Sequence, residues 1–209
     1  GHHASAHRLV HHVHAATPQD PNSARAGEGF YAFARRAWIG SFRKGLDAET
    51  RLRRNGPGGV HPYLVYCAAA AVSLAVGFAI AGWGGLLIWA ALGAHATAQL
   101  LLSDYVQHYG LTRQIMPDGR AAPMAAPHSW NAPHWFSAAF MLNAPRHSDH
   151  HAHPLRPYPS LRLPQPDVAP HLPWPLPMAC TLALFPPLWR RAIAPHLRPW
   201  RTLNPTETP

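Results

Sequence analysis

The stretch "LVYCAAAAVSLAVGFAIAGWGGLLIWAALG", residues 64–93, decides the fold. It lies in a longer segment, residues 55–103, that contains no Lys, Arg, Asp or Glu. One span of a bilayer needs about 20 apolar residues, so this segment predicts two membrane helices, residues 62–81 and 86–106. The sequence "GWGG" at residues 82–85 predicts the turn between them. We therefore expect an integral membrane protein with one transmembrane helix hairpin.

Basic residues gather on both flanks of the predicted hairpin. The chain has 18 Lys and Arg against 9 Asp and Glu, and Arg54 precedes the hairpin while Arg113 and Arg120 follow it. The positive-inside tendency places both flanks in the cytoplasm, which an even number of spans requires. The basic charge then reflects topology and contact with anionic membrane lipid, and we expect no nucleic-acid partner. Cys67 and Cys180 form no CxxC motif, so neither a disulfide framework nor a cysteine metal site is predicted.

The rest of the sequence predicts an all-α protein in three parts. Residues 1–54 form a cytoplasmic segment, residues 55–108 the hairpin, and residues 109–209 a second cytoplasmic segment, the two segments together making a helical, histidine-rich cap. Residues 1–16 look helical, and "TPQDPNS" at 17–23 breaks that helix with two prolines. Residues 27–54 have the pattern of an amphipathic helix, which lies either on the membrane surface or against its own domain.

The C-terminal part is rich in proline. Residues 154–177 predict an extended, covering segment because proline is too frequent there for a helix. "MACTLALFPPLWRRAI" at residues 178–193 is too short and too interrupted for a span. We expect a membrane-surface helix there, followed by a loose proline-rich tail.

Histidines form two closely spaced motifs, with a third histidine site between them. In "HRLVHH", residues 7–12, His7 and His11 are four residues apart and share a helical face, while His12 is about a third of a turn round. His108, in "SDYVQHYG", is expected where the second membrane helix emerges at the cytoplasmic side. All of these segments can therefore converge at the membrane face.

The second motif is "HSDHH", residues 147–151, whose histidines are spaced i, i+3 and i+4. A lone histidine pair is more often a solvated face, but two such motifs together with His108 favour metal binding. Neutral imidazole suits Zn, Cu, Fe or Ni. Seven imidazoles exceed the four ligands of one tetrahedral zinc, so two metal ions are expected. The candidate ligands are His7, His11, His12, His108, His147, His150 and His151.

The ordered motifs resemble those of the membrane-bound alkane 1-monooxygenases of the fatty-acid-desaturase-like superfamily. The resemblance covers nearly the whole chain and includes residues 7–38, "SDYVQHYG", "HSWNAPH" at 128–134 and "RHSDHHAHP" at 146–154. It implies two non-haem iron ions held by those seven histidines, and O₂ as co-substrate. It further implies hydroxylation of the terminal methyl of an alkane to a primary alcohol, with rubredoxin and its reductase as electron donors. The location it implies is a bacterial inner membrane, multi-pass, with the metal site on the cytoplasmic side.

The resemblance also implies a missing part. The family has an earlier histidine box, HExxHK, which supplies two further ligands and is absent here. We therefore expect this chain to be a C-terminal fragment with an incomplete site, itself inactive. Ala6, Val10 and Gln107 stand where the family usually has Glu, Gly and an acidic residue. A lost carboxylate weakens the orientation of a ligand.

Other polar residues are expected to support the ligands without binding metal. Asp149 is expected to hold the N–H of an imidazole, and His95, in the membrane segment, to make an interhelical hydrogen bond. The remaining supporting or structural candidates are Gln107, His128, Asn131 and His134.

Iron fits better than zinc because attack on an unactivated C–H bond needs a redox-active metal. The alternatives are a related lipid desaturase, an aromatic-methyl hydroxylase or, less favoured, a non-enzymatic membrane metal-binding protein. The last would be expected to carry histidines along its spans, where only His95 occurs.

Overall fold

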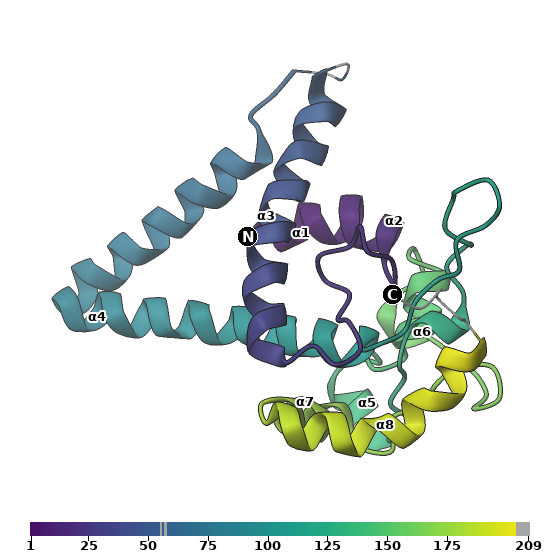
Figure 1. Cartoon of the computed structure of the whole chain (residues 1–209). Coiled ribbons are helices and arrows are strands. Elements are labelled where there is room, and N and C mark those ends of the chain that lie inside the picture. Colours follow the sequence, from purple (N-terminus) through teal and green to yellow (C-terminus); the bar gives the residue numbers. More distant parts are fainter. Residues whose placement is uncertain (55, 57, 204–209) are drawn as a thin grey trace.

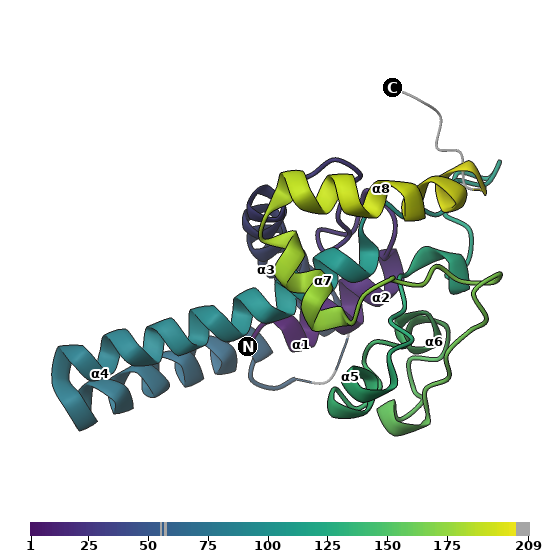
Figure 2. The same ribbon diagram turned by 90° about the horizontal axis from the view of Figure 1, so that it is seen from below.

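The computed structural model describes residues 1–54, 56 and 58–203 of the chain. Within those ranges every regular element is a helix, and β-type pairing is limited to isolated bridges between Ile115 and Ala121 and between Asn131 and His171. This confirms the all-helical prediction. A long hairpin projects away from the other helices, which pack together around its open end (Figures 1 and 2).

The hairpin is the element α4, Pro62–His108, whose hydrogen bonding continues through a reversal of the chain. Ala81 (φ −144°) and Gly82 (φ +56°) leave the helical conformation, and glycine adopts the positive φ without steric cost. The reversal falls at the start of the predicted turn, so the two predicted helices are confirmed as the arms of α4. By length and composition α4 is apolar enough to cross a membrane.

The two arms of α4 touch near the turn and diverge toward the cap. A Cβ atom added at Gly85 would lie 2.0 Å from the carbonyl oxygen of Gly77, and the Trp89 indole donates to Ser73 Oγ at 2.6 Å. Small residues allow this close approach of two backbones. His95 is exposed on the second arm and makes no hydrogen bond with any described residue, so the predicted interhelical bond is absent from that part of the chain.

Helix α3, Phe30–Arg54, closes the open end of the hairpin and makes a triangle with the two arms (Figure 1). Phe33 packs on Tyr105 of the second arm, with ring centroids 5.2 Å apart. Packing against its own domain, one of the two interpretations of this helix, is therefore confirmed. The buried face recurs every three or four residues and consists of Phe30, Phe33, Ala37, Ser41, Gly45 and Glu49.

An apolar groove of about 1100 Å³ lies between α3 and both arms of α4. We call it the hairpin groove. Its lining includes Tyr31, Trp38, Leu74, Trp89 and Leu101. Two sides of this groove belong to the segment that the sequence predicts to be in the membrane.

The C-terminal helices complete the core of the cap. They are α7, Leu176–Ala183, and α8, Pro186–Leu203. The prediction of one short helix with a loose tail from residue 194 is wrong, because α8 continues through Pro195 and Pro199. Three apolar side chains spaced four residues apart are buried, namely Trp189, Ile193 and Leu197. The free energy gained by burying this face compensates for the loss of the backbone hydrogen bonds that the two prolines cannot make. Residues 204–209 of the predicted tail lie outside the described residues.

Shorter helices carry the remaining histidines. At the N-terminus α1 (His3–Ala6), the π-helical turn η1 (His7–His11) and α2 (His12–His14) follow one another. After the hairpin come the 3₁₀ turn η2 (Ala126–His128), α5 (Trp135–Phe140), α6 (His147–Ala152) and the 3₁₀ turn η3 (Tyr158–Ser160). Residues 153–175 are otherwise extended, as predicted, and pass over α5 and α6 (Figure 2).

Candidate metal centre

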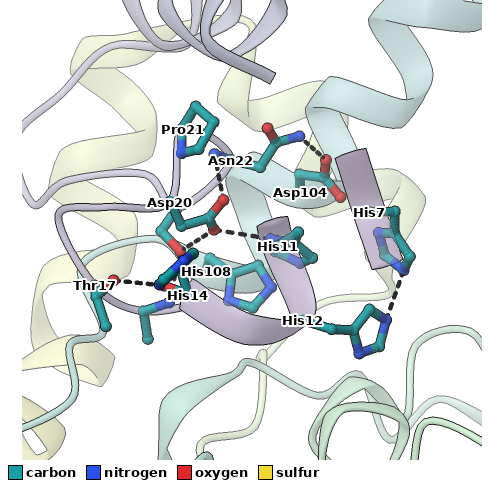
Figure 3. Close-up of polar contacts among 12 residues, drawn as sticks. His7, His11, His12, His14, Thr17, Asp20, Pro21, Asn22, Asp104 and His108 are labelled. Atoms are coloured by element: carbon teal, nitrogen blue, oxygen red, sulfur yellow. Dashed lines mark hydrogen bonds and ion pairs between the residues drawn. The ribbon is translucent and has the colours of Figure 1, made fainter. Parts of the chain in front are cut away.

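The N-terminal histidines lie on a helix whose hydrogen bonding widens at the motif itself. In η1 the His12 N–H bonds to the His7 carbonyl, five residues earlier. Residues five apart therefore share a face, and His7 and His12 have their Nε2 atoms 3.0 Å apart. The His11 ring stacks beside the His7 ring, with centroids 5.1 Å apart, and its Nδ1 faces Asp20 (Figure 3). His7 and His11 therefore lie side by side, as predicted. The wider π turn, a feature frequent at functional sites, also brings His12 against His7.

Four buried histidines converge from three segments of the chain. Their ligand atoms lie within 4.8 Å of one another, and they belong to η1, the end of α4 and α6. The Nε2 atom of His147 is 2.9 Å from that of His108 and 3.0 Å from that of His151. His11 completes this four-histidine group, with its ring 4.7 Å from that of His108.

The other three predicted ligands form a second group beside the first. His7 Nε2 lies 3.0 Å from His12 Nε2 and 3.4 Å from His150 Nε2. The two groups are neighbours because sequence-adjacent residues, His11 with His12 and His150 with His151, contribute one side chain to each. The structure therefore brings together all seven histidines that the sequence predicts as ligands.

The donor sets fit bound metal ions. Four nitrogens at about 2.0–2.1 Å from a tetrahedral ion are about 3.4 Å apart, close to the 2.9–3.2 Å between the Nε2 atoms of His108, His147 and His151. Burial, followed by the charges of the neighbouring histidines, lowers the pKa of His7 to about 2 and holds that of His147 well below its usual range. Burial and the nearby His150 lower the pKa of His12 to about 4. These three imidazoles are therefore neutral at pH 7, which is the form that binds metal.

Asp20 holds one of these imidazoles in place. The Nδ1–H of His11 donates to Asp20 Oδ2 at 2.8 Å, which leaves Nε2 as the ligand atom and fixes the ring. Burial alone would lower the pKa of His11, but the charge and hydrogen bond of Asp20 raise it. For Asp20 the two effects have the opposite sign: burial alone would raise the pKa of its carboxyl, yet the charge of His11 keeps this pKa below its usual range.

Sequence reasoning missed Asp20, because "TPQDPNS" was interpreted only as a helix breaker. The available signal was a carboxylate between two prolines, nine residues after a candidate ligand. The same network continues through Asn22, whose side-chain amide donates to Asp104 Oδ2 at 2.6 Å (Figure 3). Asp104 lies on α4, one turn before His108, so the network joins two ligand-bearing segments.

Asp149 does not contact any of the seven imidazoles through a hydrogen bond. Its carboxylate accepts from the Arg156 guanidinium and from the Arg162 N–H at 2.7 Å, and it lies 3.0 Å from His153 Nδ1. The imidazole that Asp149 contacts is thus that of His153, whose side chain is 53% exposed.

The other supporting candidates position backbone segments. Gln107 donates from Nε2 to the Ala144 carbonyl at 3.1 Å and so ties α4 to the segment before α6. Asn131 donates to Ser148 Oγ at 2.7 Å and accepts from the Ser148 N–H at 3.0 Å, which fixes the first turn of α6.

His128 and His134, the last two candidates, lie on the segment that leads to α5. His128 Nδ1 accepts from the Ala125 N–H at 3.0 Å, and burial, followed by the charge of Arg113, lowers the pKa of His128 to about 4. His134 immediately precedes α5 and is half-buried. Neither of them joins either histidine group.

The sequence model of the fatty acid desaturase family matches residues 1–182, so the chain belongs to this family. Among curated proteins, the chain is 37% identical over 193 residues to alkane 1-monooxygenase 2 of Pseudomonas aeruginosa, covering 90% of this chain. It is 37% identical over 211 residues to the alkane 1-monooxygenase of Pseudomonas putida, covering 96%. The xylene/toluene monooxygenase hydroxylase component of Pseudomonas putida is 30% identical over 205 residues, covering 93%. The chain spans about half the length of these relatives, 50–52%. The predicted resemblance is confirmed.

Proposed function

We propose that this chain supplies most of the active centre of a non-haem diiron monooxygenase that converts alkanes to primary alcohols. O₂ is the co-substrate in this proposal, and rubredoxin with its reductase supplies the electrons. One observation carries the proposal: seven imidazoles, five of them buried and two half-buried, form two adjacent groups at the base of an apolar hairpin. Relatives named alkane 1-monooxygenases, which match over nine-tenths of the chain, support the substrate class.

Iron is the metal that suits this donor set and this reaction. Imidazole ligands accept iron as well as zinc, and of these two metals only iron supplies the change of oxidation state that O₂ activation and attack on a C–H bond require. The seven imidazoles would hold the two ions, and Asp20 would keep Nε2 of His11 directed at its ion. Burial of the four-histidine group would exclude bulk water from an ion bound there.

The hairpin groove suits an extended hydrocarbon chain. Its lining is largely apolar, and it runs along the second arm of α4 as far as Leu101. Leu101 is seven residues before His108, or about 10 Å along a helix. A substrate dissolved in the bilayer would therefore approach the metal centre from the membrane side.

The same proposal places the protein in a bacterial inner membrane as a multi-pass protein. The hairpin, residues 55–108, would be inserted, and residues 1–54 and 109–209 would form the cytoplasmic cap that holds the metal centre. The apolar length of α4 supports insertion. The basic residues on both sides of the hairpin support the orientation.

A second reaction is favoured by a specific observation. The xylene/toluene monooxygenase hydroxylase component is 30% identical over 93% of the chain, so hydroxylation of an aromatic methyl group is the alternative activity. Fatty-acyl desaturation, which the family name suggests, is the third. The products separate these activities, because octane, toluene and a fatty acyl group would give octanol, benzyl alcohol and an alkene respectively.

The test uses the full-length protein that contains this chain. Replacing His150 by Ala should remove iron from the purified protein and abolish formation of 1-octanol from octane, measured by gas chromatography. The matched control is His196→Ala, because His196 is exposed on α8 and far from both groups in sequence. Full iron content and activity in His150→Ala would contradict the ligand assignment. Active protein with stoichiometric zinc and no iron would contradict the choice of metal.

A further inference from the structure

The loop of residues 153–162 is fastened to α6 by a carboxylate inside the histidine motif. Asp149 is adjacent to His150 in sequence, yet its carboxylate is directed at Arg156 and at the backbone N–H of Arg162. The Asp149 side chain is 9% exposed and that of Arg156 is 25% exposed. One carboxylate thus anchors both the early and the late part of the loop, which we call the tyrosine loop after Tyr158 at its centre.

Two further side chains hold the middle of the tyrosine loop. The Arg146 guanidinium, immediately before α6, donates to the Leu161 carbonyl, and the Asn143 amide donates to the Pro159 carbonyl at 3.0 Å. Leu161 itself is buried, at 1% exposure. The loop is therefore fixed at several points to the segment that carries the histidine motif.

The fixed loop lays an aromatic ring on one candidate ligand. The rings of Tyr158 and His150 are stacked, with centroids 5.0 Å apart and planes inclined by 23°. His150 Nε2 faces His7 at 3.4 Å, while His150 Nδ1 has no hydrogen-bond partner among the described residues. His11, by contrast, is oriented by Asp20. The orientation of the His150 ring therefore depends on packing. Tyr158 supplies the nearer of its two stacked rings, the other being His7 with its centroid at 5.7 Å.

We propose that Tyr158 is a positioning residue for the three-histidine group, and that Asp149 acts by anchoring the loop that presents it. This inference rests on the proposed function, in which that group holds a metal ion. Without the tyrosine ring, His150 gains rotational freedom and its Nε2 atom is less often directed at the ion. Among the described residues, Tyr158 stacks on His150 and on no ring of the four-histidine group, so the affinity of that group should not change. The phenol hydroxyl has no part in this role, because stacking needs only the ring.

The experiment measures metal affinity directly, with Co²⁺ as a spectroscopic probe added to the metal-free full-length protein in detergent. The visible absorption of bound Co²⁺ should report two binding steps. Tyr158→Ala should weaken one step by roughly 10–100-fold, the usual effect of losing a group that orients a ligand, and leave the other unchanged. Tyr158→Phe, the matched control, should bind as the unsubstituted protein does. Arg156→Ala, which loosens the loop without touching His150, should weaken the same step.

Three results would overturn the inference. They are unchanged Co²⁺ binding in Tyr158→Ala, a Tyr158→Phe variant as weak as Tyr158→Ala, and equal weakening of both steps. Thermal unfolding of each variant separates the last result from general loss of structure, and Arg156→Ala gives an independent reading if Tyr158→Ala is unstable. Absence of any Co²⁺ binding by the unsubstituted protein would instead contradict the proposed metal centre, and this inference with it.

Discussion

At the scale of single residues, burial decides the charge state of the histidines. A protonated imidazole in the four-histidine group would be both desolvated and close to other imidazoles, so burial and the neighbouring histidines hold the pKa of His147 and His151 well below the usual range. Only His11, which faces Asp20, has a raised pKa despite burial. In the metal-free centre the environment therefore favours neutral imidazoles, except at His11, where the Asp20 carboxylate favours the protonated form.

We expect the metal-free protein to lose stability as the pH falls below about 6.5. The folded-state pKa values of His7 and His12, about 2 and about 4, lie below the ordinary value of 6.5. Below pH 6.5 the unfolded chain therefore binds more protons than the folded chain. The contribution of these histidines to the free energy of unfolding is complete above pH 6.5 and decreases as the pH falls toward 4. His11 opposes this trend, because its pKa is raised. Urea unfolding at pH 7 and pH 5 measures the difference, and an equal or higher midpoint at pH 5 would contradict it.

Replacing Asp20 by Asn should weaken metal binding by roughly 10–100-fold, because the amide no longer fixes the His11 ring through a charged hydrogen bond. The contact at stake is the 2.8 Å bond from His11 Nδ1 to Asp20 Oδ2. The measurement is iron content after dialysis against a chelator of known affinity. Asp118→Asn is the control, because Asp118 is exposed in a turn. Equal iron retention by the two variants would contradict the role of Asp20.

The sequence predicted which histidines gather, but not how they pair. Regular helical periodicity correctly placed His7 beside His11, and their rings stack. It did not show that the π turn brings His12 against His7, or that His7 and His11 contribute to different groups of ligand atoms. Asp20 could not be found from periodicity because it lies in an irregular segment. The partner of Asp149 depends on Arg156 and on a loop conformation that no pattern of residues fixes.

At the scale of elements, the hairpin depends on contact between two glycines. We expect Gly85→Ala to destabilise the protein by about 1–3 kcal/mol, because its Cβ atom would lie 2.0 Å from the Gly77 carbonyl oxygen and force the arms apart. Gly84→Ala is the matched control, since a Cβ atom there meets nothing within 4 Å. Thermal unfolding in detergent compares the two variants. Equal melting temperatures would show that the arms are not in close contact.

Helix α8 contributes to the core despite its prolines. Trp189 is fully buried, so Trp189→Ala should cost about 3–5 kcal/mol of unfolding free energy. Leu188→Ala, one residue earlier and 56% exposed, should cost much less. Chemical denaturation measures both, and a similar loss in the two variants would contradict the packing of α8. The sequence did not predict this helix because Pro195 and Pro199 lower its local helix propensity. Burial of its apolar face stabilises it instead.

At the scale of the whole molecule, the sequence predicted the hairpin but not how the cap packs against it. The hairpin was predictable because an uncharged segment of this length has few alternatives to membrane helices, and three glycines in "GWGG" mark its turn. The placement of α3 across its open end was not, because an amphipathic pattern is equally compatible with a membrane surface and with a protein core. Phe33 and Tyr105 meet across that junction.

The proposed topology predicts which sites a membrane-impermeant thiol reagent can reach in intact spheroplasts. With Cys67 and Cys180 replaced by Ser, a cysteine at Gly84 should be labelled from the periplasmic side. Cysteines at Arg54 and Arg120, both exposed, should be labelled only after lysis. Arg113 is unsuitable for this test, because it is buried and donates to the Val13 carbonyl at 2.8 Å. Labelling of Arg120→Cys in intact spheroplasts would contradict the hairpin topology.

Because of the π turn between His7 and His12, the N-terminal helix should tolerate substitutions within the turn but not the deletion of a residue from it. Arg8, within the turn, has a side chain that is 71% exposed and lies 3.8 Å from the Glu49 carboxylate; an ion pair this long and exposed contributes little, so substitution of Arg8 should cost little. Deleting it would leave His7 and His12 four residues apart, a spacing that an ordinary α turn also brings together. The deletion would nevertheless rotate everything upstream by about 100°, and Ser5, which donates to Glu49 of α3 at 2.6 Å, would turn away from its partner. The additional residue of the π turn thus lets one short helix direct His7 and His12 toward each other and, at the same time, direct Ser5 toward α3.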